Sequence, residues 1–176
     1  PAPDLKWTRL KNDQTLEEML LDGELDAVIH SDLIDPYLNG DPNVARLFDD
    51  YKAEEIRYYQ KTGIFPIMHA MVIKKTTLEK HPWIAMNLYK AFEQAKTNSQ
   101  RHMSRAVTAR IAVPWFYRAV EDARRVFGDD FWPYGIEKNR KTLDAFLQFG
   151  YEQGVAKRRL QVEDLFPKEL SAFTRT

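Results

Sequence analysis

The stretch KTGIFPIMHAMVIKK, from Lys61 to Lys75, combines a glycine, a proline and a short apolar run. Gly63 predicts the end of the preceding helix, because glycine readily adopts the left-handed conformation common there. Pro66 predicts a rigid turn. The run from Ile67 to Lys75 is apolar on both faces, which favours a strand inside a sheet. His69 therefore stands where a loop is expected to enter a buried strand, either as a packed side chain or as part of a pocket.

A second stretch, QTLEEMLLDGELDAVIHSD from Gln14 to Asp32, predicts a helix, a tight turn and a strand. Thr15 and Glu18 have the spacing of a capping box at a helix N-terminus. Gly23 is placed to end that helix in a left-handed turn. The apolar run from Leu25 to Ile29 then predicts a short buried strand.

The rest of the chain is predominantly helical by its apolar periodicity. The predicted helices lie at 49–63, 81–100, 115–128 and 139–154, with a short helical piece at 162–170. Two isolated strands do not make a stable sheet. We therefore expect the C-terminal part of a larger α/β protein, rich in helices, whose remaining strands precede Pro1. Unpaired sheet edges in such a part also predict a homo-oligomer.

The composition limits the possible partners. Lys and Arg together number 26, as do Asp and Glu, so the net charge is zero. A neutral chain has no overall field that attracts nucleic acid, which argues against that partner. The absence of cysteine excludes disulfides, thiol nucleophiles and cysteine-ligated zinc. No apolar run approaches the roughly 20 residues needed for a membrane span.

Four longer segments resemble the 4,5-dihydroxyphthalate decarboxylase family, a branch of the type II periplasmic-binding-protein fold. They are TGIFPIMH, KHPWIAMNLYKAFEQAK, GDDFWPYGIEKNRKTLDAF and YEQGVAKRRLQVEDLF, and the resemblance extends from about Thr15 to Phe166. It implies a two-lobe fold. Residues 1–62 would end the second lobe and approach the hinge, and residues 63–176 would supply a return strand and the C-terminal helices of the first lobe.

The resemblance implies loss of CO2 from a dihydroxylated aromatic dicarboxylate by a cytoplasmic enzyme. The same fold also serves ABC transporters, so a periplasmic solute-binding protein for a small carboxylate or aromatic acid is the alternative. The reaction needs cations for the carboxylates, an acid effective near neutral pH and partners for the ring hydroxyls. Arginine suits the first role and histidine the second.

Two histidines are candidates for this chemistry. His69 is the candidate proton donor, and the alternative is a hydrogen-bonded core residue. His30 follows the first predicted strand, at the kind of strand end where α/β folds bind ligands, so it is a candidate for substrate binding together with Ser31. In the family, a small residue and a proline-rich segment more often follow DAVI, whereas this chain has His30 and Ser31 at that place. A solvated strand end is the alternative for His30 and Ser31.

Three further residues near the predicted hinge are candidates for substrate binding. Arg57 could hold a carboxylate, or it could be an exposed cation near a helix end. Tyr59 shares that helix end. Phe65 could offer a ring face to an aromatic ligand or simply fill an apolar corner.

The cofactor requirement stays open at this point. His30 and His69 could share one divalent metal with Asp32 or Asp35. The histidine spacing does not support this, because neither an HxH nor an HxxxH pattern is present.

Overall fold

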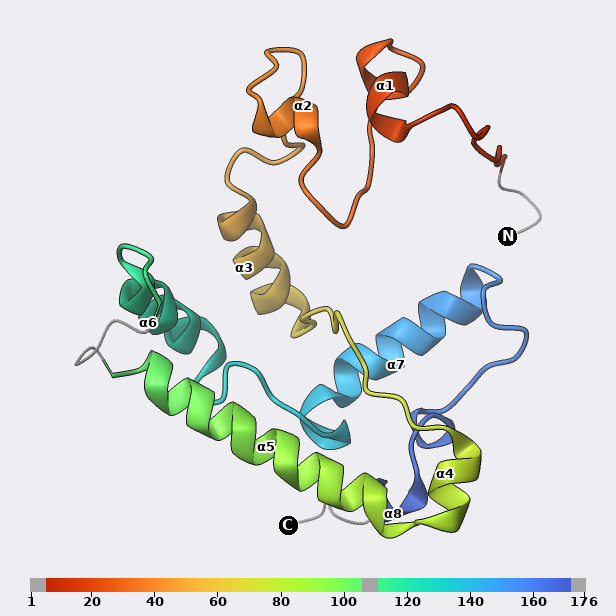
Figure 1. The fold of residues 1–176 in the computed structure, drawn as a ribbon, viewed down its shortest axis with the longest axis vertical. Helices are drawn as coiled ribbons and strands as arrows, with labels where there is room; N and C mark the ends of the chain where they lie inside the picture. Colours follow the sequence, from red (N-terminus) through yellow and green to blue (C-terminus); the bar gives the residue numbers. More distant parts are fainter. Residues whose placement is uncertain (1–5, 106–110, 172–176) are drawn as a thin grey trace. The chain divides into compact units, whose positions relative to one another are not determined.

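The structure is a computed structural model that describes residues 6–105 and 111–171 (Figure 1). Its helices in those ranges are α1 (Leu16–Leu21), α2 (Asp35–Leu38), α3 (Tyr51–Thr62), α4 (Lys75–Lys80), α5 (Trp83–Met103), α6 (Phe116–Phe127), α7 (Ile136–Glu152), the 3-10 turn η1 (Val162–Asp164) and α8 (Lys168–Ser171). The chain divides into two compact units between Glu55 and Ile56, within α3. The predicted boundary between residues 62 and 63 separates two lobes of a fold, whereas this division separates two groups of contacting residues. The lobe boundary therefore stays a prediction.

The predicted α/β fold is wrong for this structure, because the described residues contain no strand and no sheet. The predicted strand after Pro66 is irregular up to Lys74, and Met68, Met71 and Val72 are 68%, 67% and 85% exposed. An apolar run becomes a strand only beside a second strand that pairs its backbone groups. The described residues supply no such neighbour, so the two-lobe binding-protein fold is not what the structure shows.

The first predicted strand is also wrong, although the helix before it is confirmed. In α1, the Glu18 backbone N–H donates to Thr15 Oγ1 at 3.2 Å, and the Thr15 hydroxyl donates to Glu18 Oε2 at 2.9 Å. Gly23 then turns the chain at φ +74°. From Leu25 to Ile29 the chain is irregular, and Ile29 is fully exposed. Local hydrogen bonds sufficed for the helix, whereas the strand needed a distant partner.

Helix α3 begins and ends as its sequence predicts. The Asp50 carboxylate accepts a hydrogen bond from the Ala53 backbone N–H at 3.0 Å, which satisfies a free donor at the helix start. Gly63 ends the helix at φ +65°, a left-handed conformation that suits glycine.

The core of the unit formed by residues 56–171 lies between α7 and η1. Its buried residues are Ile136, Leu143, Leu147 and Val162, with Leu160 and Phe166 packed against them. In α7, Leu143 and Leu147 are buried, whereas Phe146 and Tyr151 are exposed. Both lie outside the i, i+7, i+11 stripe that starts at Ile136 and faces η1.

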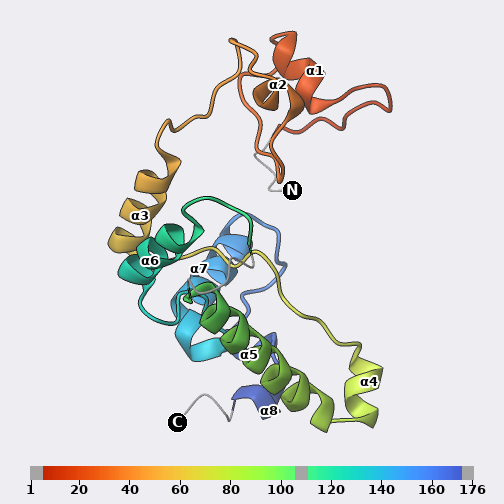
Figure 2. The same cartoon turned by 60° about the vertical axis from the view of Figure 1, so that its left-hand side comes forward.

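Helix α5 is the packing partner of two short helices in this unit. Helices α4 and α8 each pack against α5 (Figure 2).

The predicted end of α6 is confirmed by Gly128 at φ +85°. The helix predicted to begin at Asn139 begins at Ile136, so Asn139 lies inside it and donates to the carbonyl oxygens of Pro133 and Gly135, both at 2.9 Å. No helix in the described ranges combines the length and apolar character that a membrane span requires.

Candidate functional site

A pocket of about 250 Å³ lies within the unit formed by residues 6–55. Its lining comes from the irregular segment after α1, from α2 and from the segment that leads into α3. The polar or aromatic side chains of its lining that matter for chemistry are His30, Asp32, Tyr37, Arg46, Phe48 and Tyr51. The pocket therefore combines one guanidinium, one imidazole, one carboxylate and three aromatic rings.

Arg46 is held in this pocket by two tyrosines. Its Nε donates a hydrogen bond to the Tyr37 hydroxyl oxygen at 3.0 Å. Its Cζ lies 5.2 Å from the centre of the Tyr37 ring and 4.4 Å from that of Tyr51. The hydrogen bond to Tyr37 raises the pKa of Arg46 above its ordinary value. The pocket thus contains a permanent, partly buried positive charge, and its position is fixed by three contacts.

The imidazole of His30 is oriented by the backbone of Asp32. The Asp32 N–H donates to His30 Nδ1 at 3.2 Å, and the Asp32 carbonyl oxygen lies 3.1 Å from the same nitrogen. Neutral His30 can accept the first contact, and protonated His30 can donate to the second. Either state leaves Nε2 for a ligand. Ser31, predicted beside it as a binding residue, is exposed and is absent from the pocket lining.

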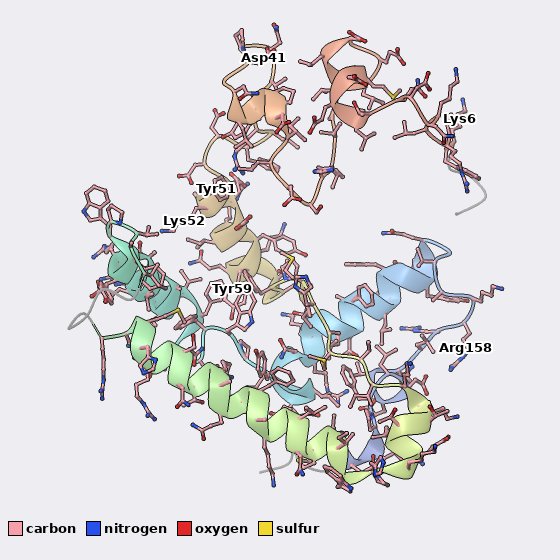
Figure 3. All side chains as sticks on the ribbon, in the orientation of Figure 1. Lys6, Asp41, Tyr51, Lys52, Tyr59 and Arg158 are labelled. Carbon is pink, nitrogen blue, oxygen red and sulfur yellow. The ribbon has the colours of Figure 1, made fainter. Side chains whose placement is uncertain are left out.

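Tyr59 and Phe65 meet in the other unit, around Phe127. The ring centres of Tyr59 and Phe127 are 4.6 Å apart, and those of Phe65 and Phe127 are 4.9 Å apart. The Trp132 ring follows at 6.0 Å from Phe65. Figure 3 labels Tyr59 near the end of α3. The four rings form an aromatic cluster that joins the end of α3 to the end of α6.

Arg57 and His69 are both exposed in this unit. Arg57 lies on α3, and His69 lies on the irregular segment that was predicted as a strand. The strand argument for His69 is therefore lost, and the resemblance alone supports its role. His30 and Ser31 belong to the other compact unit.

A polar network fixes the loop between α6 and α7. Lys96 contacts Glu93 and Asp130, each at 3.0 Å, although its side chain is only 7% exposed. Lys138 contacts Asp130 at 2.7 Å. Burial alone would raise the pKa of Asp130, but hydrogen bonds from Lys138 and Lys96 outweigh burial and hold that pKa below its ordinary value.

A second pocket, of about 390 Å³, lies between α5 and the start of α6. Met103, Ile111 and Phe116 supply much of its apolar lining, and Ser99 and His102 supply polar groups. His102 is exposed. Among residues 6–105 and 111–171, its lining includes no arginine or lysine.

Sequence reasoning missed Arg46, Tyr37 and Tyr51. The segment DPYLNGDPNV, residues 35–44, has the Asp-Pro and Asn-Gly steps typical of a loop, although Asp35–Leu38 forms α2. A useful signal was present, since Tyr37 lies inside that segment and Arg46 and Tyr51 follow it, all three within 15 positions. Their convergence depends on the turn at residues 39–44, which the sequence does not specify in three dimensions.

In residues 6–105 and 111–171, no three metal-ligating side chains gather around one point.

One comparison with known proteins now bears on this site. The chain is 35% identical over 161 residues to 4,5-dihydroxyphthalate decarboxylase from Comamonas testosteroni. The match covers 91% of this chain and 49% of that protein, so the chain spans about half the length of its relative. No family model matches the sequence.

Proposed function

We propose that this protein takes part in the non-oxidative decarboxylation of a dihydroxylated aromatic dicarboxylate of the 4,5-dihydroxyphthalate kind. The observation that carries the proposal is the 35% identity over 161 residues to a decarboxylase of that name. Because the match covers 49% of the relative, we also propose that polypeptide equivalent to its other half completes the active site. A homo-oligomer belongs to the same proposal.

The reaction exchanges one carboxylate for one proton. A ring hydroxyl para to the reacting carbon pushes electrons into the ring, and an acid protonates that carbon. The bond to the carboxylate then breaks, its electron pair returns to the ring, and CO2 leaves. The ring becomes aromatic again and the hydroxyl is unchanged overall. The product is 3,4-dihydroxybenzoate. No electron acceptor is needed.

Two histidines compete for the role of proton donor. His69 is proposed from the resemblance, which places it in the segment TGIFPIMH. His30 is proposed as a substrate-binding residue, and its place in the pocket beside Arg46 makes it the second candidate for the donor. An imidazole suits either task because its ordinary pKa lies close to neutrality.

The other substrate contacts follow the same proposal. Ser31 is assigned to a ring hydroxyl, Arg57 to a carboxylate, and Tyr59 and Phe65 to the ring. The contacts of Tyr59 and Phe65 with Phe127 support a rigid aromatic wall at those two positions. The comparison supports a decarboxylase and gives no support to the transporter alternative. The cytoplasmic location stays a prediction.

The direct test is turnover of 4,5-dihydroxyphthalate by this chain together with polypeptide equivalent to the relative's other half, followed by chromatography of 3,4-dihydroxybenzoate and by CO2 release. We expect His69→Ala to abolish turnover while the far-UV circular dichroism spectrum stays close to wild type. His81→Ala is the matched control, because His81 is exposed and its ring lies beside that of Trp83. If His30→Ala abolishes turnover and His69→Ala does not, the donor is His30. Substrate that binds but stays unchanged would contradict the proposed function.

A further inference from the structure

Arg46 has the geometry of a carboxylate anchor. The Tyr37 hydroxyl occupies Nε at 3.0 Å, and the Tyr51 ring lies 4.4 Å from Cζ. These contacts leave the two terminal nitrogens as the pair with which arginine binds a carboxylate through two parallel hydrogen bonds. Because the guanidinium is already held in place, little side-chain freedom is lost when a ligand binds.

The rest of the pocket suits the ring of such a ligand. Phe48 and Leu47 line it and are 53% and 87% exposed, so they offer apolar surface to an incoming ring. Asp32 lines it too, and a carboxylate accepts hydrogen bonds from ring hydroxyls. A volume of about 250 Å³ accommodates a single substituted benzene ring. The charges therefore match a ring that carries a carboxylate in one place and a hydroxyl in another.

We propose that the pocket formed by residues 28–51 binds an aromatic carboxylate, with Arg46 as its carboxylate anchor and Tyr37 as the positioning residue of that anchor. The ligand class rests on the proposed function, whereas the anchoring geometry comes from the contacts within this pocket. Tyr37 acts through Arg46, because its hydroxyl fixes Nε and thereby aims the terminal nitrogens.

The test is titration of the 176-residue protein with phthalate, a dicarboxylate that lacks the ring hydroxyls, and with phthalamide, its uncharged analogue. Calorimetry gives the dissociation constant for each. We expect Arg46→Gln to weaken phthalate binding about ten- to hundredfold and to leave phthalamide binding nearly unchanged. Arg46→Lys should fall between, because lysine keeps the charge but lacks the planar fork. Tyr37→Phe should weaken phthalate binding about two- to fivefold.

Arg9→Gln is the matched control. It removes the same charge from an exposed arginine of the same unit that is absent from the pocket lining. Far-UV circular dichroism of each variant checks that the helices are retained. Equal loss of phthalate and phthalamide binding would indicate a merely structural Arg46 and would overturn the anchor. The anchor would also be overturned if Arg46→Gln bound phthalate as tightly as Arg9→Gln does. It would likewise be overturned if the wild type bound no phthalate.

Failure of the proposed Arg46 anchor can be distinguished from failure of the proposed function. Phthalate binding that depends on Arg46, together with unchanged 4,5-dihydroxyphthalate when polypeptide equivalent to the relative's other half is present, would support the anchor and contradict the decarboxylase. Turnover by Arg46→Gln with wild-type KM would support the decarboxylase and overturn the anchor.

Discussion

Lys96 Nζ and Asp130 Oδ1 lie 3.0 Å apart although 34 positions separate the two residues in the sequence. The contact ties the middle of α5 to the loop before α7. Tyr134 lies in the same loop, and its ring centre is 4.8 Å from Lys96 Nζ. A nearly buried ammonium of this kind needs its carboxylates, because an uncompensated buried charge is strongly destabilising.

Asp130→Asn is therefore expected to lower the free energy of unfolding by about 1–2 kcal/mol. Glu93 remains as a second partner of Lys96, which keeps the loss below that of a lone buried pair. Urea unfolding followed by circular dichroism measures the change. Asp129→Asn is the control, since Asp129 is 88% exposed and pairs with Arg124 on the surface. An equal, small loss in both variants would contradict a structural role for the network.

The lowered pKa of Asp130 predicts that the protein loses stability in acid. Its pKa in the folded protein is depressed, so its stabilising contribution is present above the ordinary value of 3.8. That contribution is lost as the pH falls below 3.8 through the folded pKa. The wild type should thus lose more stability than Asp130→Asn between about pH 5 and pH 2. Parallel stability curves for the two proteins over that range would show that Asp130 does not supply the effect.

Phe127 should be the main support of the aromatic cluster, because both Tyr59 and Phe65 contact its ring. Phe127→Ala is expected to lower the free energy of unfolding by about 2–3 kcal/mol, somewhat less than for a fully buried ring. Phe146→Ala is the matched control, since Phe146 is 67% exposed on α7 and should cost less than about 0.5 kcal/mol. Similar losses in the two variants would contradict the packing described for Phe127.

The exposed apolar segment at residues 67–72 predicts self-association. Met71 and Val72 are 67% and 85% exposed, and contiguous apolar surface promotes association. We expect the double variant Met71→Lys, Val72→Lys to shift sedimentation of the 176-residue protein towards the monomer. Val155→Lys, at an 80% exposed position elsewhere, adds one charge as a control. A wild-type protein that stays monomeric at high concentration would contradict this prediction.

The helix ends were predictable because their signals are local. Thr15 with Glu18, Asp50 and Gly63 each act within four positions of their partners. The strands were not predictable in this way. A run such as IMHAMVIKK has strand composition, but whether it becomes a strand depends on backbone partners elsewhere.

The candidate site was only partly predictable for a related reason. His30 was predicted as a binding residue at the end of a strand, and it lines a pocket although the structure has no strand there. Arg46 was missed because its value as an anchor comes from Tyr37 and Tyr51, and a loop of unspecified shape brings those rings to it. Residue type and spacing indicate which chemistry is possible, whereas convergence depends on tertiary structure.

The central claim is that a proton replaces a ring carboxylate, and deuterium incorporation tests it most directly. Incubation of this chain, together with polypeptide equivalent to the relative's other half, with 4,5-dihydroxyphthalate in D2O, followed by mass spectrometry and NMR of the product, locates the new hydrogen. The account predicts one CO2 per product molecule and one deuterium at the carbon that carried the lost carboxylate. Substrate that is recovered intact, or a product without deuterium at that carbon, would contradict it.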